Sequence, residues 1–118
     1  MSIRTKKIAD LIRDEISLII QRKIRDERIG FLSVTEVVVT PDLSEAFVYV
    51  SILGDPESKK KSMKGIRSAA KYIRMELGKK IQLRITPKLI FREDESLERG
   101  SKIIEKLNIL KQERKEEK

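Results

Sequence analysis

Cysteine and histidine are both absent from the 118 residues of this chain. Without cysteine there is neither a disulfide framework nor a thiolate metal site. Without histidine the chain lacks the side chain that enzymes use most often as a general base. These absences count against a hydrolase or nuclease, and we expect a protein that binds without catalysis, metal or cofactor.

The acidic residues do not offer a catalytic centre in place of histidine. Glu93, Asp94 and Glu95 are consecutive, so their side chains diverge in a strand or turn and do not converge on a catalytic centre. Acids just before an apolar periodic segment are typical of a helix cap. We therefore expect Asp94 or Ser96 to cap a final helix.

Long apolar runs are also absent, since no segment approaches the roughly 20 residues that span a bilayer. The first ten residues, MSIRTKKIAD, carry charges with no apolar stretch behind them, unlike a secretion signal. We expect a soluble, cytoplasmic protein. The length fits one domain over residues 1–111, followed by a disordered charged tail at 112–118.

Positive charge is abundant but confined to one segment. The net charge is +8, and residues 58–92 contain 12 basic residues and one acidic residue. Residues 31–57 contain five acidic residues and no basic residue. Such clustering is typical of a protein that binds a polyanion, whereas an ordinary solvated surface mixes both signs.

Hydrophobic periodicity predicts the elements. Residues 5–24, 57–78 and 96–111 have the spacing of helices, the second ending near Gly78, a usual C-terminal stop. Residues 32–39, 45–53 and 84–92 are predicted strands, and the alternation slips near Glu36, which indicates a bulge or burial of both faces. Adjacent strands pair antiparallel, and the long middle helix serves as a crossover. The predicted fold is α+β, a three-stranded sheet with helices packed on one face.

Two neighbouring stripes run along the middle helix. At about 100° per residue, one arc of about 120° is apolar and an adjoining arc of about 80° is cationic. The apolar stripe consists of Met63, Ile66, Ala69, Ala70, Ile73 and Leu77, and the cationic stripe of Lys60, Lys64, Arg67, Lys71 and Arg74. Further cations follow at Lys79, Lys80, Arg84 and Lys88. We expect the apolar stripe to pack on the sheet and the cations to bind phosphates.

Two other interpretations of these surfaces remain. A basic amphipathic helix can lie on an anionic membrane, but this helix has an apolar face without large aromatics that is suited to a core. Phe47 and Tyr49 share one strand face, where aromatics on a bare sheet can stack bases. We favour a core position for Phe47 and leave Tyr49 open.

Three stretches resemble the bacterial ribosome-binding factor A family. They are IRTKKIADLIRDEISLIIQRKIRDERIGFLSVTEV, VTPDLSEAFVYVSILGD and LRITPKLIFREDESLERGSKI. The last is the most specific, with Arg84, Pro87, Leu89, Phe91, Asp94, Ser96 and Gly100 at the family's spacing. The resemblance covers about residues 3–107, with Lys71 where the family often has glycine and Glu27 where it commonly has proline.

The resemblance implies a KH-like fold of type II, in the order α-β-β-α(kinked)-β-α, with a helix kink replacing the usual GxxG loop at Ala69, Ala70 and Lys71. Sequence alone favours tight packing of the two alanines in an unbroken helix, since alanine is the best helix former. The resemblance also implies a non-enzymatic factor that binds the free small ribosomal subunit, assists 5′-end maturation of its rRNA and acts especially in the cold.

The implied partners are the small subunit and its rRNA, with no membrane or small-molecule substrate, and nothing demands more than a monomer. The expected RNA-binding residues are Lys64, Arg67, Ala69, Ala70, Lys71, Arg74, Lys79, Lys80, Arg84 and Lys88, with Arg4, Lys6 and Lys7 as possible additional contacts. The alternatives are an RNA hydrolase and a general nucleic-acid binder without ribosome specificity.

Overall fold

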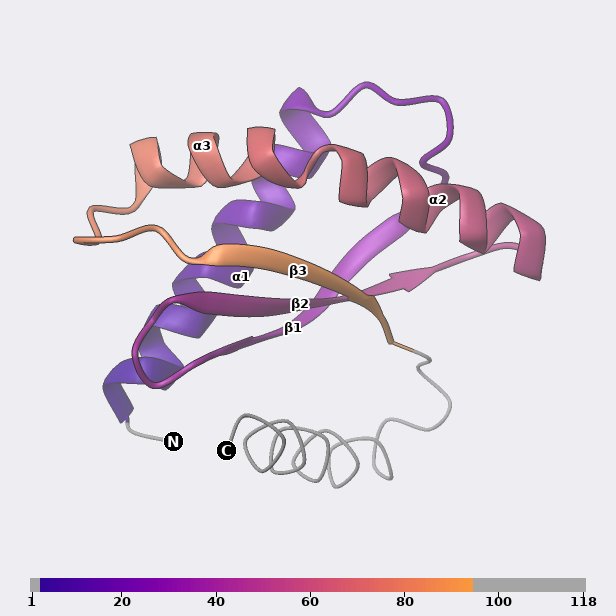
Figure 1. The fold of residues 1–118 in the computed structure, drawn as a ribbon. Coiled ribbons are helices and arrows are strands. Elements are labelled where there is room, and N and C mark those ends of the chain that lie inside the picture. Colours follow the sequence, from indigo (N-terminus) through magenta and orange to yellow (C-terminus); the bar gives the residue numbers. More distant parts are fainter. Residues whose placement is uncertain (1–2, 95–118) are drawn as a thin grey trace.

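The computed structural model describes residues 3–94 and contains three helices and three strands within them (Figure 1). In chain order they are α1 (Ile3–Lys23), β1 (Leu32–Val39), β2 (Glu45–Ile52), α2 (Pro56–Ser68), α3 (Ala70–Lys80) and β3 (Lys88–Glu93). This order confirms the predicted KH-like α+β fold through β3. The predicted helix at 96–111 and tail at 112–118 lie outside the described residues.

The sheet is mixed, in the order β1-β2-β3. β1 and β2 are antiparallel, whereas β2 and β3 are parallel because α2 and α3 form the crossover between them. The register of β1 shifts between Val34 and Glu36, which confirms the predicted bulge. Because the bulge adds one residue to the strand, Leu32 and Val34 before it and Val37 and Val39 after it can all face the core.

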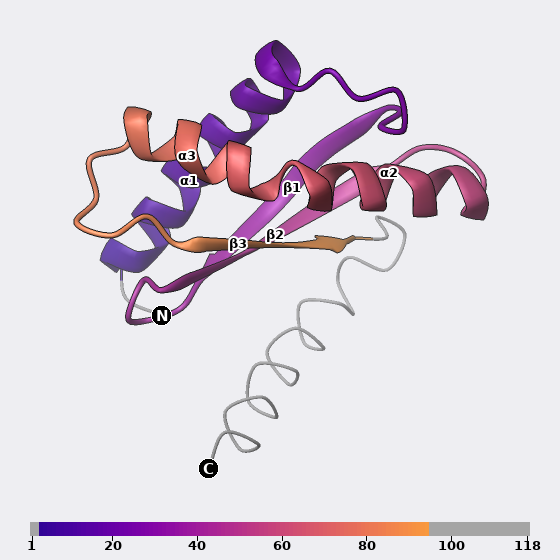
Figure 2. The same ribbon diagram turned by 45° about the horizontal axis from the view of Figure 1, so that its top comes forward.

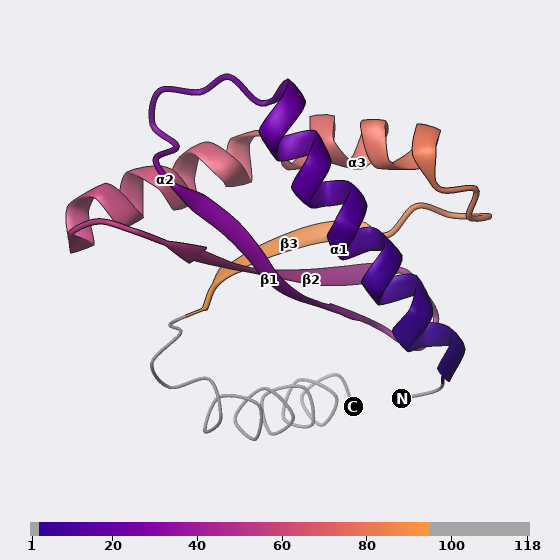
Figure 3. The same ribbon diagram turned by 180° about the vertical axis from the view of Figure 1, so that it is seen from behind.

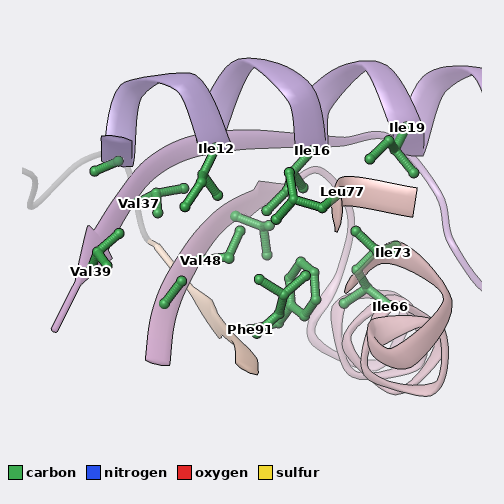
Figure 4. Close-up of a cluster of buried hydrophobic side chains, with 14 of the residues drawn as sticks. Ile12, Ile16, Ile19, Val37, Val39, Val48, Ile66, Ile73, Leu77 and Phe91 are labelled. Atoms are coloured by element: carbon green, nitrogen blue, oxygen red, sulfur yellow. The ribbon is translucent and has the colours of Figure 1, made fainter. Parts of the chain in front are cut away.

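The three described helices cover one face of this sheet (Figure 2). The core beneath them joins isoleucines of α1, alternate residues of the strands and the apolar stripe of α2 and α3 (Figure 4). Ile12, Ile16, Ile66, Ile73 and Leu77 are fully buried there. The predicted apolar stripe therefore does pack on the sheet.

The opposite face of β2 carries Phe47 and Tyr49, which are only 5% and 7% exposed. The guanidinium of Arg92, on β3, lies 4.8 Å from the centre of the Phe47 ring. The predicted burial of Phe47 is confirmed, and Tyr49 is buried as well. Neither ring is bare enough to stack a base.

Three predicted boundaries are wrong. The continuous helix over 57–78 is interrupted at Ala69 and runs on to Lys80, so the kink that the family resemblance implied is confirmed. Gly78 lies inside α3, where a Cβ would come within 2.9 Å of the Thr86 hydroxyl, so it permits close approach and does not end the helix. The third strand begins only at Lys88, because Pro87 has no N–H to donate to a ladder.

Candidate nucleic-acid interface

A row of exposed lysines follows the outer side of α2 and α3, which run end to end alongside β3 (Figure 1). Lys60 and Lys64 come from α2, and Lys71 from the first turn of α3. None of the three makes an ion pair within residues 3–94. Their charges are therefore available to an anionic partner.

The two arginines of the same row are held in place by backbone carbonyls. Arg67 Nη2 donates to the carbonyl of Phe91 on β3 at 3.3 Å. Arg74 donates from Nε and Nη2 to the carbonyl of Thr86, at 3.1 and 2.8 Å. A guanidinium has five N–H donors, so each arginine fastens its helix to the segment beside it and keeps donors for a ligand.

The break between α2 and α3 lies in the middle of the row. Ala69 has φ −88° and ψ −2°, and its N–H is shared between the carbonyls of Gly65 and Ile66 at 3.2 and 3.1 Å. No side chain caps the start of α3. Ala69 and Ala70 are half-buried, so the backbone of the break lies between Lys64 and Lys71 without a bulky side chain over it.

A shallow hollow of about 440 Å³ adjoins the C-terminal half of the row. Lys71 and Arg74 line it from α3, and Thr86 closes it from the segment before β3. The close approach of Thr86 to Gly78 brings this segment against the helix. The hollow combines two cations with a hydroxyl, a set of groups suited to a phosphate.

The remaining predicted cations divide by position. Lys79 and Lys80 are exposed at the end of α3, and Arg84 and Lys88 are exposed where the chain approaches and enters β3. These four extend the row.

Arg4, Lys6 and Lys7 are exposed in the first turns of α1, near the β1–β2 turn (Figure 1). α1 meets α3 at its other end, through Lys23, about 25 Å away at 1.5 Å per residue. They lie at the opposite end of α1 from its contact with α3.

Sequence reasoning missed the position of Glu76, the acidic residue of this basic segment. Its side chain is 7% exposed, and its carboxylate lies 3.0 Å from Lys23 Nζ and 3.6 Å from Lys79 Nζ. The hydrogen bond from Lys23 is the main cause that lowers the pKa of Glu76. The sequence did contain a signal for this burial, because Glu76 lies beside the apolar stripe of the helix and a charge buried there must be paired. Because it is buried, Glu76 presents little negative charge at the surface.

Within residues 3–94, no three side chains of the types that ligate metals gather into a group. In that same part of the chain no helix is both long enough and apolar enough to cross a bilayer. The geometry supports electrostatic binding of an extended anion along α2 and α3.

The chain matches a family model described as ribosome-binding factor A over residues 4–107. A ribosome-binding factor A from Trichodesmium erythraeum is 50% identical over 116 residues, covering 97% of this chain and 85% of the relative. One from a Synechococcus species is 46% identical over 113 residues, covering 94% of this chain and 82% of the relative.

Solved structures show the same fold. A crystal structure of ribosome-binding factor A from Thermus thermophilus has a TM-score of 0.67 at 21% identity, covering 75% of this chain and 94% of that one. A Thermus thermophilus homology model fitted into a cryo-EM map of a complex with the 30S subunit has a TM-score of 0.62 at 22% identity, covering 75% of this chain and 92% of that one.

Proposed function

Since this chain belongs to the ribosome-binding factor A family, we propose that it binds the free small ribosomal subunit and assists its assembly. A homology model of the Thermus thermophilus relative, fitted into a cryo-EM map of a complex with the 30S subunit, supports the choice of the small subunit. The observation that carries the proposal is the row of exposed lysines along α2 and α3, in a segment with 12 basic residues and one acidic residue.

The mechanism is binding of rRNA through its phosphates. Long cationic side chains neutralise phosphates and release counterions, which gives affinity without reading the base sequence. The contact set is that expected from the sequence: Lys64, Arg67, Ala69, Ala70, Lys71, Arg74, Lys79, Lys80, Arg84 and Lys88. Arg67 and Arg74 act as fixed donors because carbonyls hold them, and the lysines adapt to the backbone path.

The finer parts of the proposal follow the family. The protein holds rRNA helices in an arrangement that permits 5′-end processing of small-subunit rRNA, matters most in the cold, and acts in the cytoplasm as a monomer. It needs no catalysis, cofactor or small-molecule substrate. Arg4, Lys6 and Lys7, at the end of α1 away from α3, add only a secondary contact.

Co-sedimentation with separated small subunits, large subunits and joined ribosomes, across a salt series, tests the choice of particle. We expect the protein to migrate with free small subunits alone and to dissociate steeply as salt rises. Equal migration with all three particles would instead support a general polyanion binder. Degradation of labelled rRNA by the purified protein would support the hydrolase alternative.

Charge reversal tests the surface. Arg67 and Arg74 are poor choices because their replacement also removes bonds to Phe91 and Thr86. Lys64→Glu together with Lys71→Glu should reduce subunit binding by about 100-fold or more, since each reversal removes one phosphate contact and adds repulsion.

The matched control is Arg13→Glu with Arg22→Glu, both on α1. Both side chains reach solvent and lie outside the row and outside residues 24–31, and their replacement produces the same change in net charge. Equal losses in the two double variants would mean that binding follows net charge alone, which would contradict the proposed surface.

A further inference from the structure

Residues 24–31, here called the arch, lead from the end of α1 to the start of β1 (Figure 3). A cavity of about 400 Å³ lies beneath them. Ile20, Ile24, Leu32 and Val34 form its apolar wall, and the polar residues Ser17, Gln21, Asp26 and Ser33 also line it. The basic row contributes nothing to its lining. Its size, and its combination of an apolar wall with a few polar groups, fall in the range of sites that take small ligands.

Two side chains that line the cavity, Phe31 and Gln21, offer an aromatic ring and an amide to a ligand. Phe31 lines it although its side chain is 71% exposed, and its carbonyl accepts a hydrogen bond from the N–H of Leu53 at 3.1 Å, which fixes its backbone to the sheet. Gln21 lines the cavity from α1 and is exposed. Its amide, which has both donors and an acceptor, makes no hydrogen bond within residues 3–94.

The arch that covers the cavity is itself fixed. The buried Ser62 of α2 accepts a hydrogen bond from the Gly30 N–H at 3.1 Å and donates to the Arg28 carbonyl at 3.2 Å. Gly65 lies so close that a Cβ there would meet Ile29 Cγ1 at 2.7 Å. A preformed cavity of this kind loses little conformational entropy when a ligand enters.

Positive charge flanks the arch. Lys61 lies about 40° around α2 from Gly65, at 100° per residue, on the solvent side, and is exposed. Arg28 pairs with Asp26 at 2.7 Å, yet its side chain stays 46% exposed. Cations beside an aromatic rim are the combination with which proteins hold single-stranded RNA.

We propose that the cavity beneath the arch takes one unpaired base of RNA. Phe31 offers its ring for stacking, Gln21 reaches the polar edge of the base, and Lys61 and Arg28 attract the neighbouring phosphates. This inference rests on the proposed binding of rRNA. It adds a site for a base at the β1 edge of the sheet, whereas the phosphate-binding row lies at the β3 edge.

The first test is an NMR titration of the isotope-labelled full chain with the single-stranded oligonucleotides rA4 and rU4. We expect the backbone amides of Gln21, Ser33 and Val34 to shift together with those of Lys64 and Lys71. Shifts at Lys64 and Lys71 alone would overturn the base site and leave the proposed function intact. Absence of shifts at either place would also overturn the base site, while co-sedimentation decides the proposed function separately.

The second test measures affinity for deproteinised small-subunit rRNA with Phe31→Leu and Phe31→Tyr. Leucine removes the ring and should weaken binding roughly fivefold to a hundredfold, whereas tyrosine retains the ring and should bind like the unmodified chain. The loss should persist at every salt concentration, because stacking releases no counterions. Wild-type affinity of Phe31→Leu would overturn the proposal.

Leu53→Ala is the matched control, because Leu53 is 68% exposed beside Phe31 but does not line the cavity. We expect it to leave affinity unchanged, and an equal loss would show that general surface apolarity is responsible. A loss for Phe31→Leu with intact subunits but not with deproteinised rRNA would mean that the cavity holds a protein side chain, which would overturn the choice of a base.

Discussion

Among single residues, Glu76 is the one whose buried carboxylate fixes the position of α3, which carries part of the basic row. The Lys23 ammonium holds this carboxylate at 3.0 Å and thereby ties the end of α1 to α3. The same hydrogen bond is the main cause that raises the pKa of Lys23 and lowers that of Glu76. One ion pair thus fixes the helix that carries half of the basic row.

Replacing Lys23 by methionine should lower the thermal unfolding midpoint clearly, because Glu76 then loses its nearest partner while staying buried. Lys79→Met is the control, since Lys79 lies farther away, at 3.6 Å, and is 63% exposed. Thermal unfolding monitored by circular dichroism compares the two. A midpoint that falls equally in both variants would contradict the leading role of Lys23.

The pair also predicts a pH dependence. The folded-state pKa of Glu76 lies below the ordinary value of 4.5, so its stabilisation is fully present above pH 4.5 and is lost as the pH falls through the folded-state pKa. Glu76→Gln removes that contribution. The difference in unfolding free energy between wild type and Glu76→Gln should shrink as the pH falls below 4.5, as urea titrations at several pH values will measure. A constant difference would exclude this ionisation as its source.

Among the elements, the arch and α2 form a unit joined by one hydroxyl. Ser62 is 2% exposed and serves both the N–H of Gly30 and the carbonyl of Arg28. Asp55 fixes the start of the same helix by accepting from the N–H of Ser58 at 2.8 Å. The base cavity and the first part of the basic row therefore share one support.

Ser62→Ala should destabilise the fold by about 1–3 kcal/mol, because it leaves a donor and an acceptor of the arch without their partner. Ser68→Ala is matched in chemistry but removes only an exposed bond to the Lys64 carbonyl of its own helix, and should change stability by less than about 0.5 kcal/mol. Chemical denaturation gives both values. Hydrogen exchange at residues 29–31 should accelerate in Ser62→Ala alone, and unchanged exchange would show that the arch has other support.

For the whole molecule, charge segregation matters more than net charge. The acidic residues of 31–57 lie in the hairpin and the start of α2, whereas the cations line α2, α3 and the approach to β3. A molecule charged in this way presents one side to a polyanion. Its affinity for RNA should therefore depend on salt through a limited set of phosphate contacts.

Neutralising Lys64 and Lys71 to glutamine should reduce the slope of log affinity against log salt by about two, one for each lost phosphate contact. Arg13→Gln with Arg22→Gln should leave the slope unchanged, and Phe31→Leu should lower affinity at constant slope. Filter binding to rRNA over a salt series measures all three. A slope that falls equally in both charge variants would mean that binding has no preferred side.

The sequence by itself determined the type of each described element, the fold class, the bulge in β1 and the two stripes of the middle helix. These depend on local periodicity, because a period of 3.6 or 2 places side chains on faces without reference to the rest of the chain. The exposure of Lys64, Lys71 and the other cations followed from the same spacing.

Only the tertiary structure decided how these elements meet. The break at Ala69 has no proline or glycine to cause it, and alanine favours helix. α2 is held to the arch by Ser62 and to β3 by Arg67, whereas α3 is held to α1 by Glu76 and to the β3 approach by Arg74. The burial of Glu76, the position of Arg4 near the β1–β2 turn and the cavity beneath the arch likewise depend on residues far apart in the chain, whose contacts no local pattern contains.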